Sequence, residues 1–164
     1  MIGKAFQAVP IAILVGILTY AIITIYKKKS DKIVTHSKAI IIFTMYISIL
    51  VQMVIVARPI GTIKTSIDWV PFDMPGGNHL ILIYALANAV VFIPFGILTA
   101  IIWKKMRSYK YIFIVSFVFS FCIEALQLIL SCGQCQVEDL IMNSLGGVIG
   151  FWIINKKQSF KQLS

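Results

Sequence analysis

Five long apolar stretches, separated by short polar and basic segments, follow one another along the chain. They are Phe6–Tyr26, Ala39–Ala57, Leu80–Trp103, Tyr111–Leu130 and Leu140–Ile154. The first four have roughly the 20 residues that a helix needs to cross the hydrocarbon core of a bilayer, and the fifth is shorter. The pattern therefore predicts an all-α integral membrane protein, a bundle of about five transmembrane helices.

The composition agrees with this fold class. Of the 164 residues, 59% are hydrophobic and only 13% are charged, whereas about a quarter of the residues in soluble domains are charged. Five membrane helices with short connections use the whole length of the chain, so we expect no separate soluble domain.

Basic residues are concentrated after the first, third and fifth apolar stretches. The three groups are Lys27, Lys28, Lys29, Lys32 and Lys38; Lys104, Lys105, Arg107 and Lys110; and Lys156, Lys157 and Lys161. By the positive-inside rule these groups lie in the cytoplasm, which puts the N-terminus outside and the C-terminus inside. Membrane topology thus accounts for the net charge of +9, and we expect no nucleic-acid partner.

Polar side chains interrupt the apolar stretches at a few positions. The segment SFCIEALQLIL, Ser120–Leu130, carries Glu124 and Gln127, which share one face of a helix. In the predicted topology they lie in the outer half of the membrane. An ionisable side chain near the bilayer centre costs about 2.5–3.5 kcal/mol, so it should face a partner, a cavity or another helix. The candidate ligand-binding residues are Asn88, Glu124, Gln127, Asp139 and Asn143, with Arg58 as the candidate cation.

Two roles are open for these residues. We expect them to converge in a polar pocket in the outer leaflet, with Glu124 neutralised by protonation or by Arg58. The alternative is that a protonated Glu124 is hydrogen-bonded to Gln127 or Asn88 purely as a link between helices.

Small residues and one proline are predicted to be structural. Asp139, Asn143, Gly146 and Gly150 fall on one stripe of the fifth helix, and Gly146-x-x-x-Gly150 lets helices approach closely. We expect this stripe to hold Asp139 and Asn143 close to the fourth helix, although the same glycines could serve a homodimer. In Pro94-Phe95-Gly96, Pro94 removes one backbone hydrogen bond, so a kink is expected in the third helix.

The two outer connections have different compositions. The longer one, residues 58–79, is rich in proline and glycine and predicts turns and extended backbone. The shorter one contains Cys132-Gly-Gln-Cys135, the spacing of thiol–disulfide exchange in an oxidising compartment. Relays of that kind need a second cysteine pair, and only Cys122 remains. A local disulfide between Cys132 and Cys135, or two free thiols, are the structural alternatives to a redox function.

Together these residues resemble the VanZ-like family of bacterial membrane proteins. The pattern consists of Pro71-Phe72, Asn88 with Pro94-Phe95-Gly96, Glu124-x-x-Gln127, and Asp139-x-x-x-Asn143-x-x-Gly146. The chain departs from the family at Gln136, where members often have a second aspartate that follows an arginine. The resemblance implies a VanZ-like transmembrane domain at residues 40–155, preceded by an additional helix and basic loop (1–39) and followed by a basic tail (156–164).

The resemblance also implies a location and a role. It places the chain in the bacterial cell membrane as a multi-pass protein that lowers susceptibility to teicoplanin-like lipoglycopeptides. The interpretation that we favour is non-enzymatic: the polar pocket binds a headgroup of a membrane lipid or a lipid-linked cell-wall precursor, or the lipoglycopeptide itself. The alternative is an enzyme that modifies such a substrate, with Glu124 as general acid/base and Asp139 orienting it. We expect neither a metal nor a cofactor.

Overall fold

In the computed structural model the chain is described for residues 2–30, 36–56, 58, 60–61, 67–68 and 78–163. It divides into two compact units, Met1–Pro59 and Ile60–Ser164. Each unit has its own helix packing.

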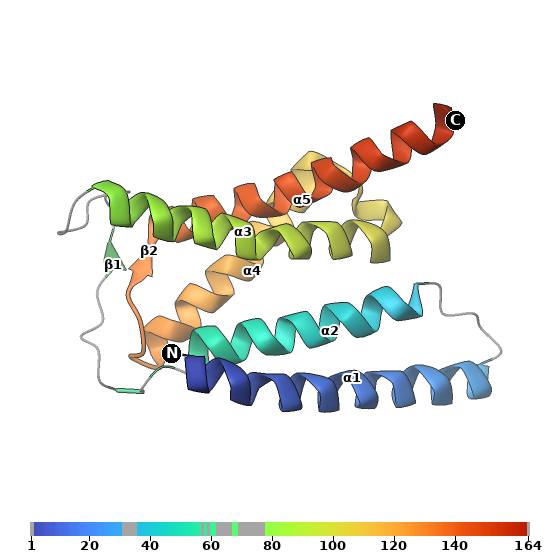
Figure 1. The fold of residues 1–164 in the computed structure, drawn as a ribbon, viewed down its shortest axis with the longest axis horizontal. Coiled ribbons are helices and arrows are strands. Elements are labelled where there is room, and N and C mark those ends of the chain that lie inside the picture. Colours follow the sequence, from blue (N-terminus) through green and yellow to red (C-terminus); the bar gives the residue numbers. More distant parts are fainter. Residues whose placement is uncertain are drawn as a thin grey trace. The chain divides into compact units, whose positions relative to one another are not determined.

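The first unit is a pair of helices that lie side by side (Figure 1), α1 (Ile2–Ser30) and α2 (Ser37–Val51), with a π-helical turn at Gln52–Val56 after α2. The two helices approach closely where α1 has a glycine. A Cβ atom at Gly16 would lie 2.7 Å from Met45 Sδ. Three residues further along α1, the hydroxyl oxygens of Thr19 and Thr44 are 3.2 Å apart. One close contact and one hydrogen bond thus join α1 to α2.

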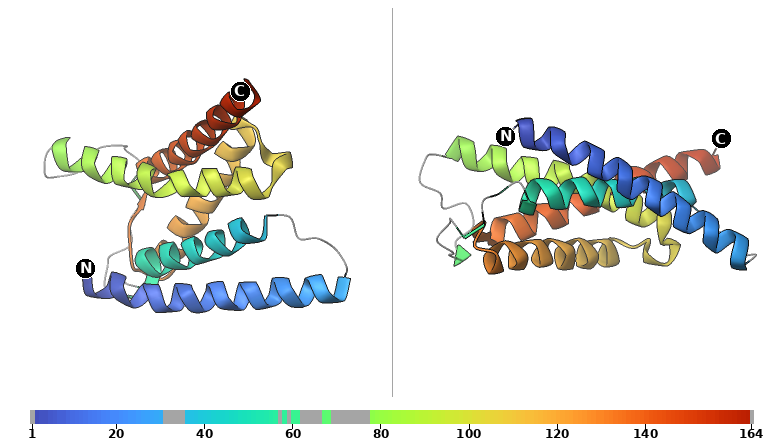
Figure 2. Two further views of the ribbon diagram at one scale, coloured as in Figure 1. Left: turned by 45° about the vertical axis from the view of Figure 1, so that its right-hand side comes forward. Right: turned by 90° about the horizontal axis from the view of Figure 1, so that it is seen from below.

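The second unit contains three long helices and two short strands. They are α3 (Asn78–Ile102), α4 (Tyr109–Ile129), α5 (Val137–Leu163), β1 (Ile67–Asp68) and β2 (Cys135–Gln136), with a 3₁₀ turn at Lys104–Met106. α3 and α5 lie side by side and share the largest contact, and α5 also packs on α4 (Figures 1 and 2). α5 is therefore the central helix of this unit.

Five helical segments of the described chain are long and apolar enough to cross a membrane. They are Val9–Tyr26, Ser37–Ile55, Leu82–Ile102, Tyr109–Ile129 and Val137–Lys156. This finding confirms the predicted all-α membrane bundle, while the orientation of the termini stays a prediction. α5 begins at Val137, two residues before the start expected at Asp139. Glu138 and Asp139 form its first turn, where carboxylates interact favourably with the helix dipole.

The α3–α5 contact depends on glycine. A Cβ atom at Gly146 would lie 2.1 Å from the carbonyl oxygen of Ala89, and one at Gly150 would lie 2.1 Å from that of Ile93. Both distances are too short for any side chain. Gly146 and Gly150 therefore pack within the chain, against α3, while Asn143 on the same stripe reaches Ser120 of α4.

Two further glycines extend this close packing. A Cβ atom at Gly96 of α3 would lie 1.9 Å from the carbonyl oxygen of Gly147, and one at Gly147 would lie 2.0 Å from Ser116 Oγ of α4. Gly147 thus lies where α5 contacts α4. α3 remains helical on both sides of Pro94, and the kink expected there stays a prediction.

The proline-rich connection before α3, residues 58–79, is described only in part. Its Ile67–Asp68 segment is an extended strand that pairs in parallel with Cys135–Gln136, and the N–H of Gly61 donates to the carbonyl oxygen of Leu130 at 3.2 Å. Both contacts attach this connection to the chain between α4 and α5. Pro71 and Phe72, which belong to the family pattern, lie outside the described residues.

Candidate functional site

Four polar side chains form a buried stripe along α4. Glu124 and Gln127 are each only 3% exposed, and Ser116 and Ser120 are fully buried. The intervals of four, four and three residues put all of them on one helical face. That face points into the protein, so Glu124 does not face lipid.

The stripe on α4 is matched by buried polar groups on α5. Asn143 Nδ2 donates to Ser120 Oγ at 2.8 Å, which joins the two helices by a hydrogen bond between side chains. Ser144 is also fully buried, and its hydroxyl donates to the carbonyl oxygen of Leu140 in its own helix.

α3 contributes to the same region through Asn88. Its Nδ2 donates to Oδ1 of Asp139 in the first turn of α5. A hydrogen bond to a carboxylate is stronger than one between neutral groups, and this one links α3 to α5. Because Asn143 is one helical turn beyond Asp139 on the same face of α5, this face carries polar links to both α3 and α4.

Cys135 lies in β2, just before α5. Its pKa is raised first by burial and then by the negative charges of Glu124 and Asp139. The carboxyl groups of α4 and α5 therefore influence the connection between these two helices.

We call these two hydrogen-bonded pairs, together with the buried Glu124 and Gln127, the polar cluster: Asn88 of α3; Ser120, Glu124 and Gln127 of α4; and Asp139 and Asn143 of α5. Its members come from three helices of the second unit. Arg58 belongs to the first unit, so its pairing with Glu124 stays a prediction. A ligand-binding role for the cluster also stays a prediction.

The cysteines adopt one of the two structural alternatives that the sequence left open. Cys132 and Cys135 are free thiols, as is Cys122. Cys132 is fully buried, and its N–H donates to the carbonyl oxygen of Gln127 at 3.0 Å. A raised pKa at Cys135 disfavours the thiolate, which is the attacking form in disulfide exchange. This geometry does not favour the redox alternative.

Several buried polar residues were missed by the sequence analysis. Three of them are serines: Ser116, Ser120 and Ser144. The four-residue spacing of Ser116 and Ser120 with Glu124 places them on one helical face and could have indicated that they are buried together. Glu138, in the first turn of α5, is a further buried polar residue. It is 4% exposed, and its Oε2 has no hydrogen-bond partner among the described residues.

Comparison with known proteins places this arrangement in a family. The family model described as VanZ/LLP1 matches residues 6–158. The chain belongs to the VanZ/LLP1 family. A curated relative, Protein VanZ of Enterococcus faecium, is 29% identical over 104 residues, which cover 61% of this chain and 61% of that protein. No solved structure matches.

The VanZ/LLP1 match covers the polar cluster and all five membrane-spanning segments. It begins before the first of them, so it includes the helix that the sequence analysis set apart as an addition. The boundaries proposed at residues 39 and 155 stay predictions. As a VanZ/LLP1 member with five candidate spans, the chain is a multi-pass protein of the bacterial cell membrane.

Proposed function

We propose that this VanZ/LLP1 protein lowers susceptibility to teicoplanin-like lipoglycopeptides by binding a headgroup at the polar cluster. The headgroup belongs to a membrane lipid or a lipid-linked cell-wall precursor. The observation that carries the proposal is the linkage of three membrane helices through Asn88–Asp139 and Asn143–Ser120, beside the buried Glu124 and Gln127.

The cost of these groups supports a role beyond helix packing. A carboxyl group inside a membrane is expensive, and such groups commonly mark a site. The glycine contacts already hold α3 and α5 together without any polar group. The carboxyl groups of Glu124 and Asp139 are therefore not needed for this helix packing.

The charge of the cluster selects among headgroups. Two carboxyl groups repel an anionic phosphate and attract a cation at the same distance, most strongly where water is scarce. An amine-bearing headgroup satisfies the cluster directly, with the amide groups of Asn88, Gln127 and Asn143 as additional hydrogen-bonding groups. A phosphate would need a bridging cation.

The experiment compares antibiotic protection by variants at matched membrane levels. Wild type, Glu124→Gln and Asp139→Asn are expressed in a susceptible Gram-positive host, and inhibition by teicoplanin and by vancomycin is measured side by side. Both variants keep a polar side chain of the same size but lose the carboxylate. We expect wild type to protect against teicoplanin and both variants to lose that protection.

A control substitution on another helix distinguishes loss of the carboxylates from general effects of mutating a membrane helix. Thr24→Val on α1 removes a hydroxyl that hydrogen-bonds only to Tyr20 of its own helix, and it should keep full protection. Protection that survives in both carboxylate variants would rule out the cluster as the binding site. A changed lipid or precursor profile in cells that express the wild type would instead favour the enzymatic alternative with Glu124 as general acid/base.

A further inference from the structure

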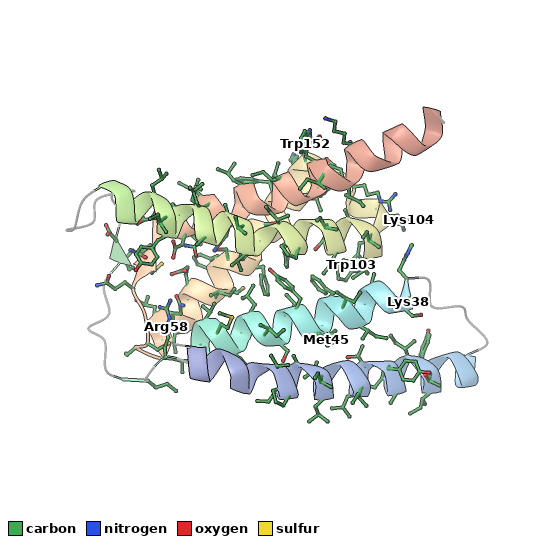
Figure 3. The ribbon with its side chains drawn as sticks, viewed as in Figure 1. Lys38, Met45, Arg58, Trp103, Lys104 and Trp152 are labelled. Carbon is green, nitrogen blue, oxygen red and sulfur yellow. The ribbon has the colours of Figure 1, made fainter. Side chains whose placement is uncertain are left out.

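A second charged region lies at the opposite end of α4 and α5 from the polar cluster. Its basic residues follow α3, begin α4 and end the apolar part of α5. We call these residues the basic end: Lys104, Lys105, Arg107, Lys110 and Lys156, all exposed. Figure 3 shows Lys104 where the chain leaves α3.

The membrane-spanning segments put the basic end at a bilayer surface. The spans Leu82–Ile102 and Tyr109–Ile129 leave only residues 103–108 between them, and the span Val137–Lys156 ends at Lys156. Trp103 and Trp152 are 43% and 50% exposed, as expected for rings at the level of lipid headgroups. The ammonium group of Lys156 lies 5.2 Å from the centre of the Trp152 ring.

The basic end is held in place by packing beneath it. Ala100, Ile112 and Phe151 form a buried apolar cluster, and the ring of Tyr109 packs edge-on against Phe151 with 4.9 Å between centroids. Arg107 Nε donates to the carbonyl oxygen of Ala100 at 2.8 Å, which satisfies a group at the end of α3. The lysines therefore project from a fixed scaffold.

The acidic residues of the described second unit are carried by other parts of the fold. These residues, Asp68, Glu124, Glu138 and Asp139, lie in β1, the outer half of α4 and the start of α5. The first turn of α4 has no acidic residue, and Ser108 before it makes no side-chain cap. The positive end of the α4 dipole therefore adds to the lysine charges.

We propose that the basic end binds the phosphate group of an anionic phospholipid headgroup. Clusters of four to eight basic residues beside membrane helices attract anionic lipids, with about 1 kcal/mol for each Lys or Arg near the surface. Lys104, Lys105 and Lys110 supply point charges and exposed donors, while Arg107 holds the turn. This site is separate from the polar cluster, because it lies at the other end of α4 and α5.

The test uses the purified full-length protein in detergent. Binding of phosphatidylglycerol and of phosphatidylcholine is measured by native mass spectrometry for wild type and for the triple variant Lys104→Gln/Lys105→Gln/Lys110→Gln. Arg107 is left unchanged because it bonds to α3. The matched control, Lys27→Gln/Lys28→Gln/Lys29→Gln near the end of α1, removes the same charge from the other unit.

We expect wild type and the control to prefer phosphatidylglycerol, and the triple variant to lose roughly tenfold or more in affinity for it. Phosphatidylcholine binding should not change. Equal losses in both triple variants would mean that total charge, not this site, attracts the lipid. Full competition by inorganic phosphate would assign the site to a free anion and overturn the lipid assignment. Thermal unfolding of both variants checks that the fold is kept.

Discussion

α5 packs against its two neighbours in contrasting ways. Its contact with α3 brings backbone against backbone, since Gly146 and Gly150 face the carbonyl oxygens of Ala89 and Ile93. Its contact with α4 is made through side chains: Ser116 Oγ lies over Gly147, and Asn143 bonds to Ser120. A backbone contact cannot adapt to added volume, whereas a side-chain contact can. The contact with α3 therefore fixes the position of α5, whereas the contact with α4 tolerates changes of side chain.

The largest effect is expected where a methyl group meets backbone. Gly146→Ala should lower the free energy of unfolding by about 1–3 kcal/mol, because α3 must move away to admit the new atom. Gly16→Ala on α1 is the control, since its Cβ would meet the flexible end of Met45 at 2.7 Å. There the gain in helix propensity, up to about 1 kcal/mol, should offset the crowding.

Unfolding in detergent, followed by circular dichroism, compares these two alanine variants. Equal destabilisation of both would contradict the distinction between backbone and side-chain contacts. It would indicate instead that any added methyl group in a helix contact is harmful.

A smaller effect is expected on the α4 side, and it should be reversible. Gly147→Ala places a Cβ atom 2.0 Å from Ser116 Oγ, and Ser116→Gly removes that atom. We expect the double variant to recover about 1 kcal/mol relative to the sum of the single changes. The same strategy should fail on the α3 side, where Gly146→Ala combined with Ala89→Gly leaves the carbonyl oxygen in place. If both double variants recovered stability, the two contacts of α5 would not differ in their tolerance of added volume.

Much of the fold could be predicted because the membrane imposes it. A span needs about 20 apolar residues, so the stretches that contain α1 to α5 were visible in the sequence. The stripe through Gly146 and Gly150 was also visible, and it showed which face of α5 is buried. It could not show which helix covers that face, because small residues permit close approach to any partner.

The candidate site was only partly visible for a related reason. Glu124, Asp139 and Asn143 stand out because such groups are rare in apolar stretches. Ser116, Ser120 and Ser144 do not, since serine occurs often at helix contacts in membranes and carries no charge. The strand pairing of Ile67–Asp68 with Cys135–Gln136 joins segments that are far apart in the sequence, and no local pattern predicts such a pairing.

The smallest effect concerns the outer connection, where the polar cluster meets Cys135. Because Glu124 and Asp139 raise the pKa of this thiol, Glu124→Gln or Asp139→Asn should lower it and increase the thiolate fraction at a fixed pH. We expect alkylation to accelerate by up to roughly tenfold, measured by mass spectrometry in a Cys122→Ser background. Asp68→Asn removes a carboxylate from the neighbouring strand and should change the rate less than either cluster variant. An unchanged rate in both cluster variants would mean that the two carboxyl groups carry no charge near Cys135. A neutral cluster would not select an amine-bearing headgroup.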